Sequence, residues 1–156
     1  ELLCGRGRPP GPAPTALPLA PHRGTAGVRG PVDAPPWPGP PGELVLRVRL
    51  GPRDDWFTAA ALRTLVTRAY RVSSAGNRIG LRLDGPALER GRHGELASEG
   101  MVLGAVQVPP DGRPVLFLAD HPTTGGYPVV GVVREADLGQ VAQAVPGTPV
   151  RFTPVR

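Results

Sequence analysis

The sequence predicts a mainly β fold, a barrel of antiparallel or mixed strands with two short helices. After residue 42, short apolar segments recur and turn residues separate them, which is typical of an all-β domain. Only two segments carry helical periodicity, too few for repeated βαβ units. Twelve of the 22 prolines lie at or before Pro41, and the first 42 residues also hold eight glycines. We therefore expect a proline- and glycine-rich linker over residues 1–42 and one folded domain over residues 43–156.

The predicted strands follow from two kinds of apolar pattern. Within residues 44–50, Leu44, Leu46, Val48 and Leu50 alternate with Val45, Arg47 and Arg49. This period of two is typical of a strand with one face in a core. Residues 115–119 are continuously apolar, as in a strand buried on both faces. Turn sequences such as Pro109-Pro110-Asp111-Gly112 separate the segments. The full set of predicted strands spans residues 44–50, 70–73, 79–83, 101–108, 115–119, 129–133 and 150–152.

Two segments have the spacing of amphipathic helices. The first is expected to run for about four turns, with Asp54 and Asp55 at its N-terminus, where acidic residues are favourable. The second spans residues 136–144. The apolar stripe of the first helix comprises Phe57, Ala61, Leu65 and Ala69.

Composition excludes several classes of chemistry. All 18 basic residues are arginine, so a P-loop lysine, a kinase lysine and a Schiff-base lysine are ruled out for this chain. Cys4 is the sole cysteine, which leaves no intrachain disulfide and no cysteine-rich metal site. The net charge of +5 comes from arginines spread among acidic residues, so we predict no nucleic-acid partner. No apolar run reaches the length of a membrane span; we expect a cytoplasmic protein and, because it starts at Glu1, part of a longer polypeptide.

Two polar segments are candidates for a functional site. Residues 73–80 are rich in Ser, Gly and Asn, and residues 119–128 place Asp, His, two Thr, two Gly and Tyr directly after the most apolar predicted strand. Loops held by a rigid scaffold often carry binding and catalytic groups. Both segments also suit ordinary turns between strands, for which Ser, Asn and Gly are the favoured residues. The sequence lacks a GxSxG elbow, a GxGxxG fingerprint and recognisable zinc-ligand spacing.

Four segments of the chain resemble one known family, in order and at its spacing. Ser74 to Pro86 is similar to the family pattern S-x-x-(S/D)-N/D-R-x-G-x-R-L-x-G-P. The other three are Ser98-Glu99-Gly100, the segment GAVQVPPDGRP at residues 104–114 and the segment LADHPTTGGYP at residues 118–128. The chain resembles the biotin-dependent carboxyltransferase or allophanate hydrolase subunit 2 family. That family includes the C subunit of 5-oxoprolinase, KipA-like proteins and the carboxyltransferase part of urea amidolyase.

The resemblance implies a cyclophilin-like β-barrel and places this chain as the C-terminal of two such subdomains. It implies a component like the C subunit of an ATP-dependent 5-oxoprolinase complex, which hydrolyses 5-oxo-L-proline to L-glutamate. The partners would be proteins like the A and B subunits of that complex, one of them KipI-like, with ATP used through the assembled complex. Two alternatives stay open: carboxyl transfer to urea or a related amide, with biotin on a partner carrier, and a non-catalytic KipA-like role in binding a partner protein. No metal is expected in any of these.

The resemblance also implies the site residues. The expected catalytic residues are Arg78, Glu99 and Asp120. Arginine would hold a carboxylate, and an aspartate would act as acid or base if burial raised its pKa. Hydroxyls and glycine amides would donate hydrogen bonds to a developing oxyanion. The expected substrate-binding residues are Asn77, Gln107, Thr123, Thr124, Gly125, Gly126 and Tyr127.

Overall fold

The computed structural model describes residues 39–155. The predictions for Cys4 and for nearly all of the linker therefore lie outside the described residues. The secondary structure runs β1 (Leu44–Leu50), a 3-10 turn (Asp54–Trp56), α1 (Ala59–Thr67), β2 (Tyr70–Val72), β3 (Gly80–Asp84), β4 (Glu99–Gly100), β5 (Ala105–Gln107), β6 (Val115–Phe117), β7 (Thr124–Gly125), β8 (Val129–Val133), α2 (Glu135–Val141) and β9 (Pro149–Pro154).

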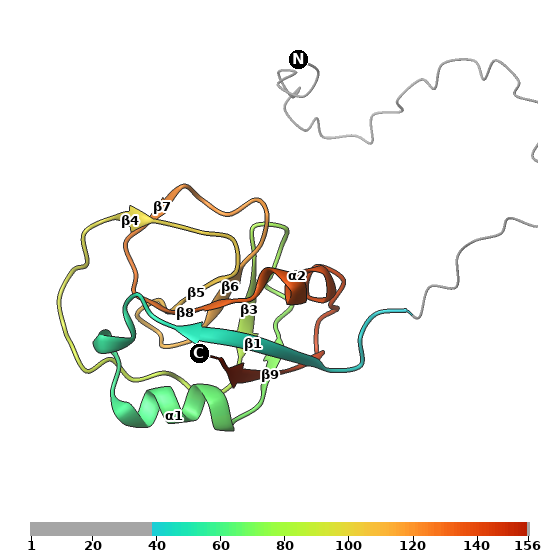
Figure 1. Cartoon of the computed structure of the whole chain (residues 1–156), viewed down its shortest axis with the longest axis horizontal. Helices are drawn as coiled ribbons and strands as arrows, with labels where there is room; N and C mark the ends of the chain where they lie inside the picture. The colour runs from blue at the N-terminus through green and yellow to red at the C-terminus, as the bar shows by residue number, and fades with distance from the viewer. Residues whose placement is uncertain (1–38, 156) are drawn as a thin grey trace, which may run out of the picture. The chain divides into compact units, whose positions relative to one another are not determined.

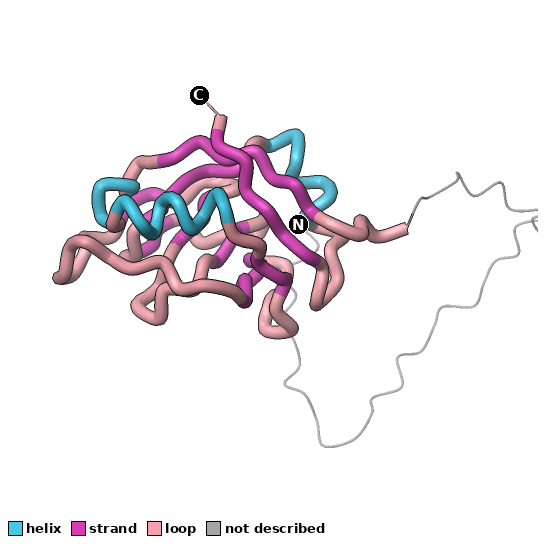
Figure 2. Tube along the Cα trace, turned by 90° about the horizontal axis from the view of Figure 1, so that it is seen from below, coloured by secondary structure: helices cyan, strands magenta, loops and turns pink. Residues whose placement is uncertain are grey.

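Seven strands close into a barrel in the order β1-β8-β5-β6-β3-β2-β9. The pair β1–β9 is parallel and closes the ring, whereas the other neighbouring pairs are antiparallel. Figure 2 shows the strands curving around the interior, with the two helices at its periphery. The predicted mixed barrel with two helices is confirmed.

The alternation of β1 explains how the barrel fills its interior. Leu44, Leu46 and Val48 are almost fully buried, while Val45 and Arg47 face outward. The inward residues join aliphatic side chains from the other strands and from both helices in one continuous core. Burial of this apolar surface is the main force that holds the barrel closed.

An ion pair attaches α2 to the outside of β1. Asp137 is buried and accepts hydrogen bonds from both the backbone N–H (2.8 Å) and the side chain of Arg47. The hydrogen bond from the Arg47 side chain holds the pKa of Asp137 below its ordinary range. Asp137 is thus a structural carboxylate that stays ionised at neutral pH.

The first helix is shorter than its sequence pattern predicts. Asp54 and Asp55 form a separate 3-10 turn, and α1 begins after Thr58, whose hydroxyl accepts the N–H of Ala61 at 3.1 Å. A threonine N-cap satisfies a helix-start amide directly, so the two acidic residues are not needed there. The helix ends at Thr67, which leaves Ala69 exposed rather than on the buried stripe.

The predicted strand over residues 101–108 is largely a turn. The Ala105 N–H donates to the Val102 carbonyl at 3.1 Å, and Gly104 has φ of +80°, where an added Cβ would lie 2.7 Å from the Val133 carbonyl oxygen. Only glycine fits there without strain. The regular strand is therefore restricted to β5.

A two-stranded ribbon of β4 and β7, which the sequence did not predict, lies beside the barrel. Glu99 pairs with Gly125 and Gly100 pairs with Thr124 (Figure 1). Near it, a second apolar cluster of Met101, Ala105, Phe117 and Val129 lies on the outer side of the barrel strands. This cover explains why the strand around residue 116 is apolar on both faces, as predicted.

Candidate functional site

The predicted site residues separate into two groups. The first group, which we call the Arg78 corner, consists of Asn77, Arg78 and Asp120 and lies where β3 begins and β6 ends. There the Leu118 N–H donates to the Ile79 carbonyl at 2.9 Å. This hydrogen bond brings residues 78 and 120 together although 42 positions separate them in sequence.

A solvent-exposed ion pair occupies the Arg78 corner. Arg78 Nε donates to Asp120 Oδ2 at 2.8 Å, with side-chain exposures of 87% and 56%, so the burial expected of the catalytic aspartate is not found. Asn77 Oδ1 accepts the Ile79 N–H at 2.9 Å, which fixes the turn before β3. Asn77 and Arg78 also line a pocket of about 310 Å³. The Arg78 guanidinium therefore keeps its Nη donors available to a ligand while Asp120 orients it.

The second group, which we call the ribbon group, surrounds β4 and β7. Its members are Glu99, Gln107, Thr123, Thr124, Gly125, Gly126 and Tyr127. The ribbon is anchored to the barrel because the Met101 N–H donates to the Thr123 carbonyl at 2.9 Å and the Val108 N–H donates to the Pro128 carbonyl at 3.0 Å. Thr123 and Thr124 are exposed, so their hydroxyls face solvent at the edge of the group.

Arg53 holds the carboxylate of Glu99. Arg53 Nε lies 3.0 Å from both Glu99 oxygens, and its Nη2 donates to Oε1 as well. Hydrogen bonding from Arg53 holds the pKa of Glu99 below its ordinary value, and the same bond raises the pKa of Arg53. Glu99 is therefore ionised at neutral pH and is a weak base, which suits an electrostatic or positioning role and not a proton donor.

Gln107 is buried and supports the backbone of the ribbon group at Tyr127. Its side chain is 6% exposed, and Nε2 donates to the Tyr127 carbonyl at 3.1 Å. Gly125 crosses directly over it: an added Cβ would lie 2.7 Å from Gln107 Nε2 and 2.7 Å from Met101 Cε. The glycine at this position allows the ribbon to lie against the barrel. In this arrangement Gln107 positions the backbone of the ribbon group.

The exposed end of the ribbon group is built around Tyr127. Its side chain is 44% exposed, and the guanidinium carbon of Arg90 lies 5.9 Å from the centre of its ring. Gly126 and Tyr127 line a pocket of about 360 Å³. Arg90 lies outside the two polar segments and the family-like motifs that the sequence singled out, so it was not predicted as a site residue.

Arg53 was missed for a different reason. It follows the end of β1, where its backbone N–H donates to the Val129 carbonyl at 3.0 Å and places it opposite β4. Nothing in the local pattern around Arg53 shows that it pairs with a residue 46 positions later. An arginine between Pro52 and two aspartates was the available signal.

The histidines and carboxylates do not converge. Asp120 pairs with Arg78 rather than with its neighbour His121, whose Nδ1 lies 2.9 Å from the Pro122 carbonyl oxygen. Within residues 39–155, no three His, Cys, Asp or Glu side chains gather as a metal site would require. No helix in that same range is both long and apolar enough to cross a membrane.

The fold and these loops together define a closed β-barrel domain whose polar groups lie on loops held by the barrel. A comparison with family models assigns it: the model for "Carboxyltransferase domain, subdomain A and B" matches residues 7–154. The chain belongs to this carboxyltransferase-domain family, and the predicted membership is confirmed.

Known relatives share this assignment. The chain is 38% identical over 107 residues to the 5-oxoprolinase C subunit of Escherichia coli, covering 69% of this chain and 34% of that protein. It is 41% identical over 86 residues to the 5-oxoprolinase C subunit of Haemophilus influenzae, covering 55% and 28%. The crystal structure of the K. lactis urea amidolyase superimposes with a TM-score of 0.69 at 28% identity, covering 74% of this chain and 8% of that one. The chain thus spans about a third of the length of the bacterial relatives.

Proposed function

We propose that the chain is part of a component like the C subunit of an ATP-dependent 5-oxoprolinase complex that hydrolyses 5-oxo-L-proline to L-glutamate. The main support for this proposal is sequence similarity to the C subunits of two bacterial 5-oxoprolinases. The sequence identity to those subunits is higher than the identity to the urea amidolyase structure. The name of these relatives implies partner subunits, so we expect partners like the A and B subunits of such a complex, one of them KipI-like.

The Arg78 corner supplies the groups that lactam hydrolysis needs. As water attacks the ring carbonyl carbon, negative charge develops on the carbonyl oxygen, and the exposed Nη donors of Arg78 are suited to stabilise it, a role different from the carboxylate contact that the sequence suggested for this arginine. The Asp120 carboxylate, which is hydrogen-bonded to Arg78 Nε, is suited to accept the proton of the attacking water. The proton then passes from Asp120 to the ring nitrogen as the C–N bond breaks, which leaves the amine and the new carboxylate of glutamate and returns Asp120 to its carboxylate form.

The ribbon group offers further contacts for a substrate. Glu99 is held charged by Arg53, and Gln107 fixes the backbone that carries Gly126 and Tyr127. The exposed threonine hydroxyls and the glycine amides offer further donors. We assign ATP binding to partner subunits, because the described part of this chain has neither lysine nor a phosphate-binding glycine-rich loop.

A second candidate is carboxyl transfer to urea or a related amide, with biotin on a partner carrier. The structural similarity to urea amidolyase favours it. A third is a non-catalytic KipA-like role, in which the same polar loops bind a partner protein without turnover.

Reconstitution of the full-length protein with its partner subunits tests these candidates. We expect glutamate release from 5-oxo-L-proline that requires ATP, and a fall of about 10²- to 10⁴-fold for Asp120→Ala. The matched control is Arg151→Ala, which removes an exposed arginine paired with Glu43 on the barrel surface. Biotin-dependent carboxylation of urea without glutamate release would replace the proposal with the second candidate. A stable complex without either activity would support the third.

A further inference from the structure

Arg90 lines the pocket beside Tyr127. The proposed reaction assigns no role to this arginine. The pocket measures about 360 Å³, within the range of small-molecule sites. Its wall combines an aromatic ring, two glycines and one arginine. The lining residues are Arg90, Gly94, Glu95, Leu96, Pro110, Gly126 and Tyr127.

The structure holds Arg90 in place from several sides. Its Nη2 donates to the Val108 carbonyl at 2.7 Å, and its guanidinium lies over the Tyr127 ring. The backbone is fixed as well, because Arg90 bridges to Phe57 and the Gly91 N–H donates to the Trp56 carbonyl at 2.8 Å. An arginine held in this way loses little conformational freedom when a ligand binds.

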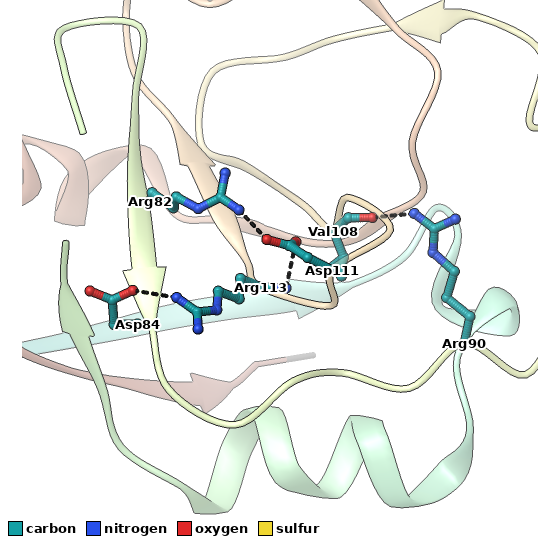
Figure 3. Close-up of polar contacts among 6 residues, drawn as sticks. All are labelled: Arg82, Asp84, Arg90, Val108, Asp111 and Arg113. Atoms are coloured by element: carbon teal, nitrogen blue, oxygen red, sulfur yellow. Dashed lines mark hydrogen bonds and ion pairs between the residues drawn. The ribbon is translucent and has the colours of Figure 1, made fainter. Parts of the chain in front are cut away.

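Arg90 has no carboxylate partner among the described residues, although carboxylates lie on neighbouring loops. Asp111, on the turn that borders the same pocket wall, faces away: it accepts from Arg82 and from the Arg113 N–H (Figure 3). Arg90 Nε is also buried without a hydrogen-bond partner. A partly buried guanidinium without a counter-charge is unfavourable, and an anionic ligand at its Nη atoms would reduce that cost, although the buried Nε stays out of the ligand's reach.

Arg90 and Arg78 differ in the way that matters for ligand binding. Arg78 already gives Nε to Asp120 and is 87% exposed, so water screens its charge. Arg90 is partly buried and lies against an aromatic wall, where a charge-assisted hydrogen bond from its Nη atoms to a carboxylate is strong. The pocket also contains Glu95, so a simple inorganic anion would meet repulsion, while a ligand with an N–H donor beside its carboxylate would not.

We propose that Arg90 binds the carboxylate of a small cyclic amide in this pocket, with Tyr127 against the ring, and so selects 5-oxo-L-proline over neutral amides. The inference rests on the proposed function. It makes Arg90 the residue that separates a lactam acid from urea.

The test measures ligand binding and hydrolysis by the full-length protein in its complex. The ligands are 5-oxo-L-proline and 2-pyrrolidone, the same lactam without the carboxylate, titrated by calorimetry. For Arg90→Gln we expect the Kd and KM for 5-oxo-L-proline to rise about 10- to 100-fold, with 2-pyrrolidone binding unchanged. Arg90→Lys should recover part of the loss. The matched control is Arg92→Gln, two residues away, whose arginine pairs with Asp55 on the surface.

A second measurement needs no variant. In the wild-type complex, 5-oxo-L-proline should protect Arg90 from modification by phenylglyoxal, read by mass spectrometry, and 2-pyrrolidone should not. Equal affinity of the two lactams, or no protection of Arg90, overturns the inference even if Arg90→Gln fails to fold. Normal 5-oxoproline hydrolysis by Arg90→Gln with an unchanged KM overturns the inference and leaves the proposed function standing. Arg90-dependent binding of 5-oxo-L-proline without hydrolysis supports the pocket and removes the proposed function.

Discussion

The Arg78 corner and the ribbon group each contain an arginine–carboxylate pair, but the two pairs lie in different surroundings. The Arg78–Asp120 pair is exposed and joins two strand ends by a single contact. The Arg53–Glu99 pair is more buried, makes several hydrogen bonds and lies beside a buried glutamine and a tightly packed glycine. Exposed pairs contribute little to stability. We infer that the ribbon group has a mainly positioning role and that the Arg78 corner has the chemical role proposed above.

The strongest test of this comparison is Gly125→Ala. The added methyl group would overlap Gln107 Nε2 and Met101 Cε, both at 2.7 Å, and either side chain must move within a packed site. We expect a loss of about 1 kcal/mol in the free energy of unfolding, because both contacting atoms are side-chain ends that can shift but are packed in a buried site, with lower activity because the Gln107 bond to Tyr127 is disturbed. Urea unfolding followed by circular dichroism measures the stability change.

Gly126→Ala is the matched control for that change. An added Cβ there meets the Leu96 carbonyl oxygen at 3.6 Å, an ordinary contact. We expect its unfolding free energy to lie close to that of the wild type. Equal destabilisation by both substitutions would show that any methyl group disturbs the loop and that the packing against Gln107 is not special.

The sequence predicts the barrel well because period-2 alternation is a local signal. Residues 44–50 and 129–133 are found with their correct bounds, since each strand must bury one face or both. The ribbon escapes prediction because Glu99-Gly100 and Thr124-Gly125 are too short to show a period. The first helix is predicted too long because Ala69 fits the apolar stripe by its spacing alone. In the structure, Arg68 already has extended backbone angles, so the helix ends before Ala69.

For the candidate site, the sequence predicts residues but not the contacts between them. Family-like motifs identified Arg78, Asp120 and Gln107, but not which of them meet. The partners Arg53 and Arg90 come from a strand exit and a polar loop, and long-range backbone hydrogen bonds bring them to the ribbon. Sequence spacing carries no information about such contacts until the barrel has closed.

The pH dependence of stability tests the Arg53–Glu99 pair. Its expected effect on the unfolding free energy is smaller than that of Gly125→Ala. Hydrogen bonding from Arg53 holds the pKa of Glu99 in the folded protein below its ordinary value of 4.5. The unfolded chain therefore binds the proton more readily, and the pair stabilises the fold above the unfolded pKa. This stabilisation should disappear as the pH falls through the folded pKa.

Comparing wild type with Glu99→Gln isolates this contribution. The difference in unfolding free energy should be constant near neutral pH, shrink as the pH falls below about 4.5, and vanish in strong acid. Asp137, whose pKa is also lowered, is present in both proteins and cancels. A difference that does not change with pH would show that Glu99 acts through packing rather than through its charge.

The smallest effect on stability is expected at the Arg78 corner. Asp120→Asn removes the charge of an exposed pair and should change the unfolding free energy by no more than about 0.5 kcal/mol. The same substitution should sharply reduce turnover in the assembled complex, because an amide cannot accept the proton of the attacking water. Thermal melting and glutamate release, measured on the same preparation, separate the two effects. If Asp120→Asn lowered stability as much as Gly125→Ala and left turnover intact, the roles assigned to the two regions would have to be exchanged.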